Sequence, residues 1–139
     1  MEQLTAVIVE DDLLFAQALT AFLEDLGYQV LATTDTEQGA VQVVRERRPD
    51  VVLMDVKLIG GSGLDAASMI RQSSEVPIVF CTTYADDGAV QSAVQSLGNA
   101  ALIGKPFDEA EVTDLLASVV KKKSGPTFAE LLRVPQPFG

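Results

Sequence analysis

The sequence predicts an α/β fold in which helices cover both faces of a doubly wound parallel sheet. Five short apolar segments, each too short for a helix, alternate along the chain with five amphipathic segments of helical spacing. A (βα)5 alternation of this kind is typical of parallel strands joined by right-handed helical crossovers. The chain of 139 residues, 47 % of them hydrophobic, is long enough to bury the core of one domain without cross-links.

The first two strand and helix pairs are predicted before residue 49. Residues 4–9 form a nearly continuous apolar run, typical of a strand buried on both faces of a parallel sheet. The next helix is indicated by apolar side chains on one helix face and by a terminating glycine, at Phe15, Leu19, Phe22, Leu23, Leu26 and Gly27. Residues 28–32 are the second predicted strand. The second helix follows a cap at Thr36, has a basic last turn and stops before Pro49.

The other three pairs complete the alternation. Strands are predicted at residues 51–54, 78–81 and 101–103, and the first two of these are almost entirely apolar. The helices between and after them are expected at residues 64–72, 88–97, where Gly98 closes the helix, and 108–122. Ligands of doubly wound sheets collect beyond the carboxyl ends of the strands, so the informative residues are expected directly after each strand.

The charge balance argues against a broad surface for nucleic acid or anionic membrane. Ten basic and 20 acidic residues give a net charge of −10. The charge is uneven, because residues 1–120 carry −13 and residues 121–139 carry +3. No apolar run approaches the roughly 20 residues of a membrane span, and the first apolar run is too short for a signal peptide. We therefore expect a cytoplasmic protein.

The chain has a single cysteine, Cys81, which excludes an internal disulfide. It lies within the apolar fourth predicted strand. Buried cysteines behave as small apolar residues, so Cys81 is expected to be an inert core side chain.

Polar side chains follow four of the five predicted strands, at the points where those strands end. They are Glu10, Asp11 and Asp12 after the first strand, Asp55 after the third, Thr82 and Thr83 after the fourth, and Lys105 after the fifth. Because the carboxyl ends of parallel strands meet at one edge of a sheet, these groups are expected to converge.

Such a set of groups predicts a site for a divalent cation and a phosphoryl group. Crowded carboxylates are unfavourable without a counter-ion, and hard oxygen ligands select Mg²⁺ or Mn²⁺. Lys105 supplies a point charge suited to phosphate, and Thr82 can donate a hydrogen bond to a phosphoryl oxygen. Asp55, held beside the metal, would act as a nucleophile that forms an acyl phosphate.

Single residues of this set also have simpler roles open to them. Asp12 suits the N-cap of the first helix. Thr82 and Thr83 suit a turn, and Lys105 taken alone suits a solvated surface. The joint placement of the groups after successive strands favours the shared site.

Four motifs resemble those of the receiver domain of two-component response regulators. The strings VIVEDD, VVLMDVKL, PIVFCTTYAD and LIGKPF occur in the family's order and spacing over about residues 3–122. Four agreeing motifs are far more specific than any one of them. The resemblance implies a flavodoxin-like three-layer sandwich with sheet order 2-1-3-4-5. It also implies a receiver domain over residues 1–122 and a short C-terminal tail over residues 123–139.

The resemblance implies roles for the acids and for one backbone carbonyl. Asp55 corresponds to the phosphoacceptor. Asp11 corresponds to a direct metal ligand and Glu10 to the acid that supports the metal site. Lys57 corresponds to the residue whose backbone carbonyl completes the coordination of Mg²⁺ or Mn²⁺.

The fourth and fifth predicted strands carry both matches and departures. Thr82 and Lys105 correspond to the phosphate-contacting pair, and the peptide bond before Pro106 is expected to be cis. Leu102 stands where the family usually has an aromatic residue that rotates inward, so the resemblance does not extend to that switch. With the string FCTTY, Leu102 is partly similar to stand-alone receivers that carry an F-A-T-G-Y motif. The loop KLIGGSGLD departs too, and its glycines at 60, 61 and 63 would allow positive φ angles.

These features predict a stand-alone signalling module that is not an enzyme. The resemblance implies that Asp55 accepts a phosphoryl group from a phosphohistidine of a sensor histidine kinase or histidine phosphotransfer protein. The output would be a changed surface for a downstream protein target. The tail has no room for a DNA-binding domain, so no direct contact with nucleic acid or membrane is expected. Its lysines at 121–123 would suit the end of the last helix, and Thr127 could cap a short turn.

Two other functions fit the same fold class. A phosphatase of the haloacid dehalogenase type also uses an aspartyl phosphate, Mg²⁺, a threonine and a lysine. That family needs its nucleophilic aspartate directly after the first strand, where this chain has Glu10. A flavin carrier would need a phosphate-cradling loop rich in Ser, Thr and Gly after the first strand, and the sequence has acids there.

Overall fold

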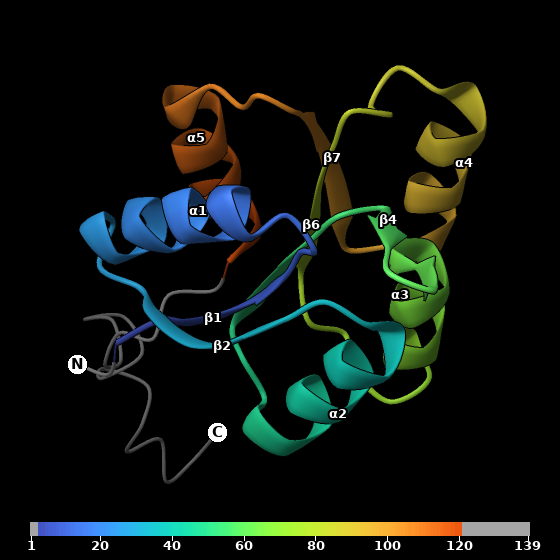
Figure 1. Cartoon of the computed structure of the whole chain (residues 1–139), viewed down its shortest axis with the longest axis horizontal. Coiled ribbons are helices and arrows are strands. Elements are labelled where there is room, and N and C mark those ends of the chain that lie inside the picture. The colour runs from blue at the N-terminus through green and yellow to red at the C-terminus, as the bar shows by residue number, and fades with distance from the viewer. Residues whose placement is uncertain (1–2, 121–139) are drawn as a thin grey trace, which may run out of the picture.

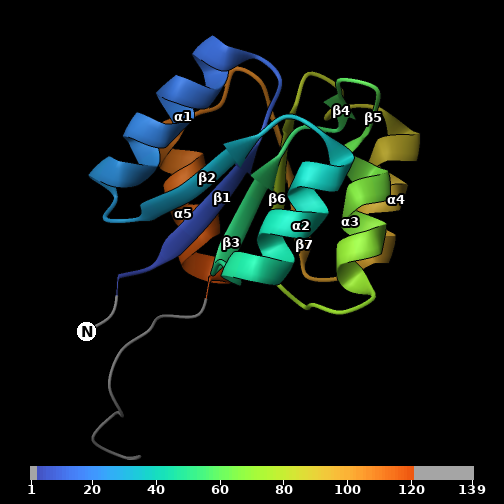
Figure 2. The ribbon, with the colours of Figure 1, turned by 60° about the horizontal axis from the view of Figure 1, so that its bottom comes forward.

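The computed structural model describes residues 3–120, which fold around a five-stranded parallel sheet (Figures 1 and 2). The strands lie in the order β2-β1-β3-β6-β7, which is the predicted 2-1-3-4-5 when the strands of this sheet are counted along the chain. Their bounds are Thr5–Val9 (β1), Gln29–Thr34 (β2), Val51–Met54 (β3), Ile78–Thr82 (β6) and Ala100–Gly104 (β7). All neighbouring strands pair in parallel, which confirms the predicted fold class.

Helices cover both faces of this sheet and make a three-layer sandwich (Figure 1). One face is covered by α1 (Leu13–Asp25) and α5 (Glu109–Val119). The other face is covered by α2 (Glu37–Arg47), α3 (Gly63–Arg71) and α4 (Gly88–Leu97). The chain thus crosses over one face through α1 and over the other through α2, α3 and α4, so helices lie on both faces, as in other doubly wound sheets.

Alternate side chains of the central strands form two separate cores. From β1, Ile8 packs with α1 and α5, whereas Val7 and Val9 pack with the helices of the opposite face. The strands β3 and β6 are buried along their whole length. Side chains of a strand point to opposite faces in turn, so a strand covered on both faces must be apolar throughout.

Side-chain caps begin the helices where the chain leaves the sheet. The Asp12 carboxylate accepts the Phe15 N–H at 3.1 Å, and the Thr36 hydroxyl accepts the Gly39 N–H at 3.0 Å. These bonds confirm the two predicted N-caps. The second helix ends at Arg47, and its C-cap residue Arg48 has a left-handed φ of 47°. Pro49 follows directly and cannot continue the helix.

Apart from shifts of one or two residues at element ends, such as β2 at 29–34 instead of 28–32, the structure differs from the predicted elements in two places. A two-stranded antiparallel hairpin, β4 (Lys57–Leu58) with β5 (Gly61–Ser62), follows β3 and was not predicted. Its strands are too short to leave a periodic pattern in the sequence. The last helix ends at Val119 instead of at residue 122, and Val120 is already extended, consistent with the weak helix propensity of two adjacent β-branched residues. The predictions for the lysines at 121–123 and for Thr127 lie outside the described residues.

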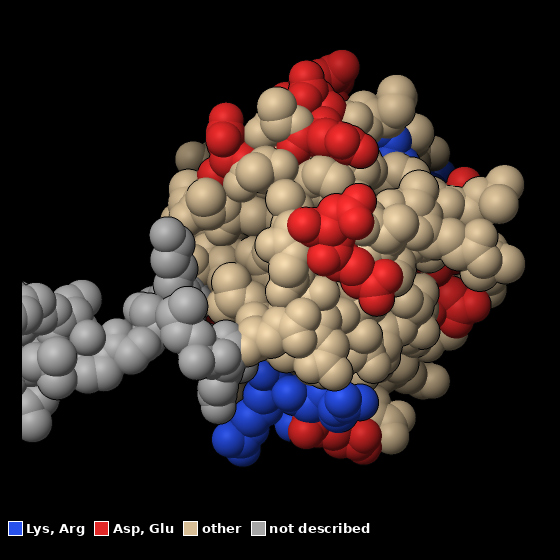
Figure 3. Space-filling model, turned by 90° about the vertical axis from the view of Figure 1, so that its left-hand side faces the viewer, with Lys and Arg blue, Asp and Glu red and all other residues tan. Residues whose placement is uncertain are grey.

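Acidic side chains are spread over the surface seen in Figure 3, and basic side chains gather at its lower edge, where α2 ends. The last turn of α2 holds Arg45 and Arg47, placed favourably at the negative end of the helix dipole. Within residues 3–120, no helix is long and apolar enough to cross a membrane.

Cys81 lies in the core on the α1 and α5 side of the sheet, as predicted. Burial raises the pKa of the Cys81 thiol to about 12 from its ordinary 9.0. Between these two pH values the folded protein keeps a proton that the unfolded chain loses. The free energy of unfolding therefore falls as the pH rises through this range. The contribution of the Cys81 thiol to stability is fully present only below about pH 9.

We expect the substitution Cys81→Ala to flatten the alkaline loss of stability. Between about pH 7.5 and about pH 10.5, titration of the Cys81 thiol should reduce the free energy of unfolding of the native chain by about 2 kcal/mol. The variant lacks this reduction. Urea unfolding of both proteins at both pH values measures this difference. The cavity left by the substitution lowers the stability of the variant equally at both pH values, so it does not affect the pH-dependent change. Tyr28 and Lys105, whose pKa values are also raised, titrate in both proteins and contribute equally to both. An equal alkaline decline in the two proteins would contradict the prediction.

Candidate functional site

The predicted site residues lie together at the carboxyl edge of the sheet. Glu10 directly follows β1 and its N–H donates to the Thr34 carbonyl at 2.8 Å, which continues the strand pairing by one residue. Asp55 follows β3, and its N–H donates to the Val9 carbonyl at 2.9 Å. Since β1 and β3 are neighbours in the sheet, the bond from Asp55 to Val9 places Asp55 beside Glu10, the residue that follows Val9.

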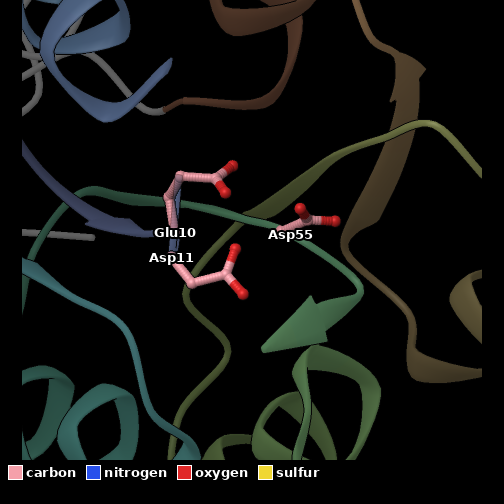
Figure 4. Close-up of side chains that lie close together, drawn as sticks. All are labelled: Glu10, Asp11 and Asp55. Carbon is pink, nitrogen blue, oxygen red and sulfur yellow. The ribbon is translucent and has the colours of Figure 1, made fainter. Parts of the chain in front are cut away.

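Three carboxylates share the space between the ends of β1 and β3 (Figure 4). One oxygen each of Glu10, Asp11 and Asp55 can be chosen so that all lie within 4.8 Å of one another. Glu10 is buried, Asp55 is half-buried and Asp11 is exposed. A cluster of carboxylate oxygens that is open on one side suits a hard divalent cation such as Mg²⁺ or Mn²⁺.

The Lys105 ammonium links two of these carboxylates. Its Nζ lies 2.6 Å from Glu10 Oε1 and 2.8 Å from Asp55 Oδ2. Burial alone would lower the pKa of Lys105, but the hydrogen bonds and charges of Asp55 and Glu10 outweigh it and raise that pKa. Lys105 therefore stays charged, and it lies 4.3 Å from the centre of the Phe15 ring.

Glu10 is the acid most enclosed by the protein. Its burial raises the pKa of the carboxyl group above 4.5, and the nearby Asp55 charge acts in the same direction. The hydrogen bonds from Lys105 and from the Asp12 N–H, the latter 3.0 Å from Glu10 Oε2, oppose this rise without cancelling it. Both oxygens of Glu10 are thus engaged by the protein, which suits a supporting role at the site.

Backbone groups of the following loop pack closely around Asp55. Its Oδ1 accepts the Val56 N–H at 2.7 Å, and the Gly63 N–H donates to the Val56 carbonyl at 2.7 Å. A Cβ atom at Gly63 would overlap the Asp55 carbonyl oxygen.

Of the three glycines expected to allow positive φ, only Gly60 adopts it, with φ 69°. For Gly63, and for Gly61, that expectation is wrong, because the missing side chain leaves room for a close neighbour.

Thr82 and Lys57 lie at the same edge without contacting the acids through their side chains. Thr82 is fully buried, its hydroxyl accepts the Tyr84 N–H at 3.1 Å, and its carbonyl accepts the Lys105 N–H at 2.9 Å. Lys57 is exposed, and its Nζ lies 4.8 Å from the centre of the Tyr84 ring. This contact joins the loops that follow β3 and β6. The peptide bond between Lys105 and Pro106 is cis, as predicted.

The sequence did not single out two residues that shape the site. Phe15 was expected only in the apolar face of α1, yet its ring lies beside the Lys105 ammonium. Glu37, in the first turn of α2, accepts the Ser62 N–H at 2.6 Å. An acidic residue that directly follows a cap was visible in the sequence, but its partner lies 25 residues away.

The comparisons with known proteins agree on one family. A model of the response regulator receiver domain matches residues 6–117. Phyllosphere-induced regulator PhyR of Methylorubrum extorquens is 34 % identical over 116 residues, which are 82 % of this chain and 42 % of that protein. Transcriptional regulatory protein PdtaR of Mycobacterium tuberculosis is 33 % identical over 113 residues, which are 81 % of this chain and 53 % of that protein. The chain thus spans about half the length of these curated relatives.

A solved structure repeats the fold over nearly all of its length. The receiver domain of the sensor histidine kinase PA1611 from Pseudomonas aeruginosa, which holds a magnesium ion in its active site cleft, superposes with a TM-score of 0.76 and 29 % identity. The superposition covers 85 % of this chain and 98 % of that one. With the sheet order, the clustered acids and the match over residues 6–117, these similarities show that the chain belongs to the response regulator receiver domain family.

Proposed function

We propose that this chain is a phosphoacceptor module of a two-component phosphorelay and not an enzyme. Asp55 accepts a phosphoryl group from a phosphohistidine in a Mg²⁺-dependent reaction, and the protein's interaction surface then changes. One observation carries the proposal: the Lys105 ammonium bridges Glu10 and Asp55 beside a third acid, Asp11, at the edge where ligands of this fold class bind.

The acids divide into two groups by exposure. Asp11 and Asp55 face the open side of the cluster and would bind the cation directly, together with the Lys57 carbonyl. Glu10, which already accepts bonds from Lys105 and the Asp12 N–H, would support it from the buried side. When bound, Mg²⁺ or Mn²⁺ supplies positive charge for the oxygens of the phosphoryl group.

Phosphoryl transfer needs positioning and charge more than covalent chemistry from the protein. A carboxylate oxygen of Asp55 would form a bond to phosphorus as the P–N bond breaks, and the electron pair of that bond would return to the imidazole. Lys105 would move its contact from the carboxylate to a phosphoryl oxygen. The Thr82 hydroxyl accepts the Tyr84 N–H through a lone pair, so its proton is available to donate to the same group.

The output would pass through the loop that follows β6 and through α4. Thr82, the last residue of β6, directly precedes this loop, and Asp87 ends it by capping α4 with bonds to the N–H groups of Ala89 and Val90. Leu102, which replaces the usual aromatic residue, packs half-buried in the core on the α4 side. The output therefore depends on movement of the loop and of α4, since Leu102 has no ring to rotate.

The proposed phosphodonor is a sensor histidine kinase or a histidine phosphotransfer protein, and the recipient of the signal is another protein. A Bartonella quintana relative of the same fold, 27 % identical with a TM-score of 0.69, is named as the anti-anti-sigma factor PhyR. This name supports a protein target over nucleic acid. We place the module in the cytoplasm and its boundary near residue 122, with residues 123–139 as a tail.

A phosphatase of the haloacid dehalogenase type is not favoured. The residue directly after β1 is Glu10, whose oxygens are engaged by Lys105 and Asp12, whereas the acid placed for attack follows β3. The family match also favours the receiver.

Incubation with acetyl phosphate and Mg²⁺ tests the proposal. We expect the intact mass to rise by one phosphoryl group, and hydroxylamine to remove it, because acyl phosphates react with this nucleophile. No phosphate should be released from general phosphate monoesters. Turnover of such esters, or no labelling when Mg²⁺ is present, would contradict the proposed function.

The lifetime of the phosphoryl group should depend on the contact between Lys57 and Tyr84. These side chains meet across the loops beside Asp55 and should obstruct the approach of water. An exposed cation–π contact is worth about 0.5–1 kcal/mol, so the Lys57→Gly, Tyr84→Ala double variant should lose phosphate about 2- to 5-fold faster. Decay of the labelled protein after removal of acetyl phosphate measures the rate.

The variant Tyr84→Phe is the matched control, because it keeps the ring that lies against Lys57 and removes only the hydroxyl group, which also interacts with Lys57. We expect its decay rate to equal that of the native chain. Equal decay rates in the double variant and the native chain would show that this contact does not limit hydrolysis.

A further inference from the structure

The side chain of Glu37 joins the start of α2 to the hairpin β4–β5. Its Oε1 accepts the Ser62 N–H at 2.6 Å. The side chain also lies directly against Gly61, where an added Cβ would meet Glu37 Cδ at 2.6 Å and Cγ at 2.8 Å. Because Gly61 has an ordinary φ angle, its lack of a side chain serves this close approach and not a special backbone conformation.

The residue bonded to Glu37 is connected to the site by short contacts. Ser62 pairs directly with Lys57 in the hairpin, and its hydroxyl accepts the Leu64 N–H at 3.1 Å at the start of α3. The next residue, Gly63, donates to Val56 and lies against the Asp55 carbonyl. The short segment of residues 61–63 is thus held between the Glu37 carboxylate and the backbone that carries Asp55 and Lys57.

A favourable position in the first turn of a helix does not by itself account for this arrangement. An acidic residue there interacts with the helix dipole and needs no specific partner. The Thr36 hydroxyl already caps α2 by accepting the Gly39 N–H. The Glu37 side chain instead turns to a backbone N–H of another element, across a glycine that leaves room for it.

We propose that Glu37 is a positioning residue for the cation site. It holds Ser62, and through the β4–β5 pairing it fixes the backbone of Lys57, whose carbonyl is the ligand that the proposed function assigns to the cation. The inference rests on that proposed function. Figure 2 shows the hairpin at the same end of the molecule as the start of α2. Residues that orient metal ligands typically affect metal affinity 10- to 100-fold.

Two substitutions break the same contact from opposite sides. Glu37→Ala removes the acceptor, and Gly61→Ala pushes the carboxylate away from Ser62 while leaving Glu37 in the chain. We expect each to weaken Mg²⁺ binding about tenfold, and the double variant to be no weaker than either single variant, because both remove one interaction. Glu37→Gln keeps an oxygen acceptor and should stay within about twofold of the native affinity.

Calorimetric titration with Mg²⁺ gives the affinity, and urea unfolding gives the stability of the same proteins. Glu46→Ala is the matched control: it removes an exposed glutamate of α2 whose partner is Gln42, far from the hairpin, and should leave Mg²⁺ affinity unchanged. A loss of stability in Glu37→Ala with unchanged Mg²⁺ affinity would overturn the inference, since that is what a purely structural role predicts.

The two proposals fail in different ways. If the native chain binds Mg²⁺ and Asp11→Asn weakens binding while Glu37→Ala does not, the inference about Glu37 is wrong and the proposed function stands. If the native chain does not bind Mg²⁺ at all, the proposed cation site is wrong, and so is the proposed role of Glu37.

Discussion

The substitution Asp55→Asn is expected to abolish covalent labelling by acetyl phosphate. The amide that replaces the carboxylate has no nucleophilic oxygen able to form an acyl phosphate. The geometry should change little, because an amide oxygen can still accept the Val56 N–H that now bonds to Asp55 Oδ1. Intact-mass measurement after incubation with acetyl phosphate and Mg²⁺ checks this result.

Two neighbouring acids provide the comparisons. Asp11→Asn should lower Mg²⁺ affinity and the labelling rate together, because Asp11 belongs to the carboxylate cluster. Asp12→Asn should leave both unchanged, since asparagine caps the start of α1 as well as aspartate does. Undiminished labelling of Asp55→Asn would show that another residue is the acceptor.

The substitution Gly63→Ala is expected to damage both the fold and the site. The new Cβ would overlap the Asp55 carbonyl oxygen, and the neighbouring atoms are backbone that cannot rotate away. Overpacking at a buried position of this kind costs about 3 kcal/mol of unfolding free energy. Relief by movement of the Asp55 backbone would displace the carboxylate that is the proposed acceptor, so labelling should also fall strongly.

Gly88→Ala is the matched control, because a Cβ at Gly88, the first residue of α4, has no neighbour within 4 Å. We expect no loss of stability there, or a gain of about 0.5 kcal/mol from the better helix propensity of alanine. Urea unfolding and acetyl phosphate labelling of both variants measure the two effects. If Gly63→Ala matched Gly88→Ala in both, the close approach at Asp55 would have no functional consequence.

The sequence by itself determined the fold class, the layers and the edge at which the site lies. Apolar runs such as residues 51–54 and 78–81 have the length and composition of strands buried on both faces, and a helical pattern separates them. Once the strands are parallel, residues that directly follow them must meet at one edge. This is why Asp55 and Lys105 could be assigned to one site although they lie 50 residues apart.

Local patterns could not determine how the loops pack at that edge. The two-residue strands β4 and β5 leave no periodic signal, so the hairpin and the contact of Glu37 with Ser62 were not predicted. The glycines of this loop were visible in the sequence. A glycine can serve either a positive φ angle or a close contact with a neighbouring atom, and the sequence does not distinguish the two roles. Only the tertiary structure shows that Gly63 makes room for the Asp55 carbonyl.

The pairing of Lys105 with Glu10 was likewise decided by the tertiary structure. The two residues lie 95 positions apart, directly after strands β1 and β7, which are separated in the sheet by β3 and β6. The lysine side chain must therefore reach over the ends of two strands to Glu10 and Asp55, and its ammonium group also lies against the Phe15 ring of α1. Such a contact depends on strand order, side-chain length and helix placement together, and no local sequence pattern carries all three.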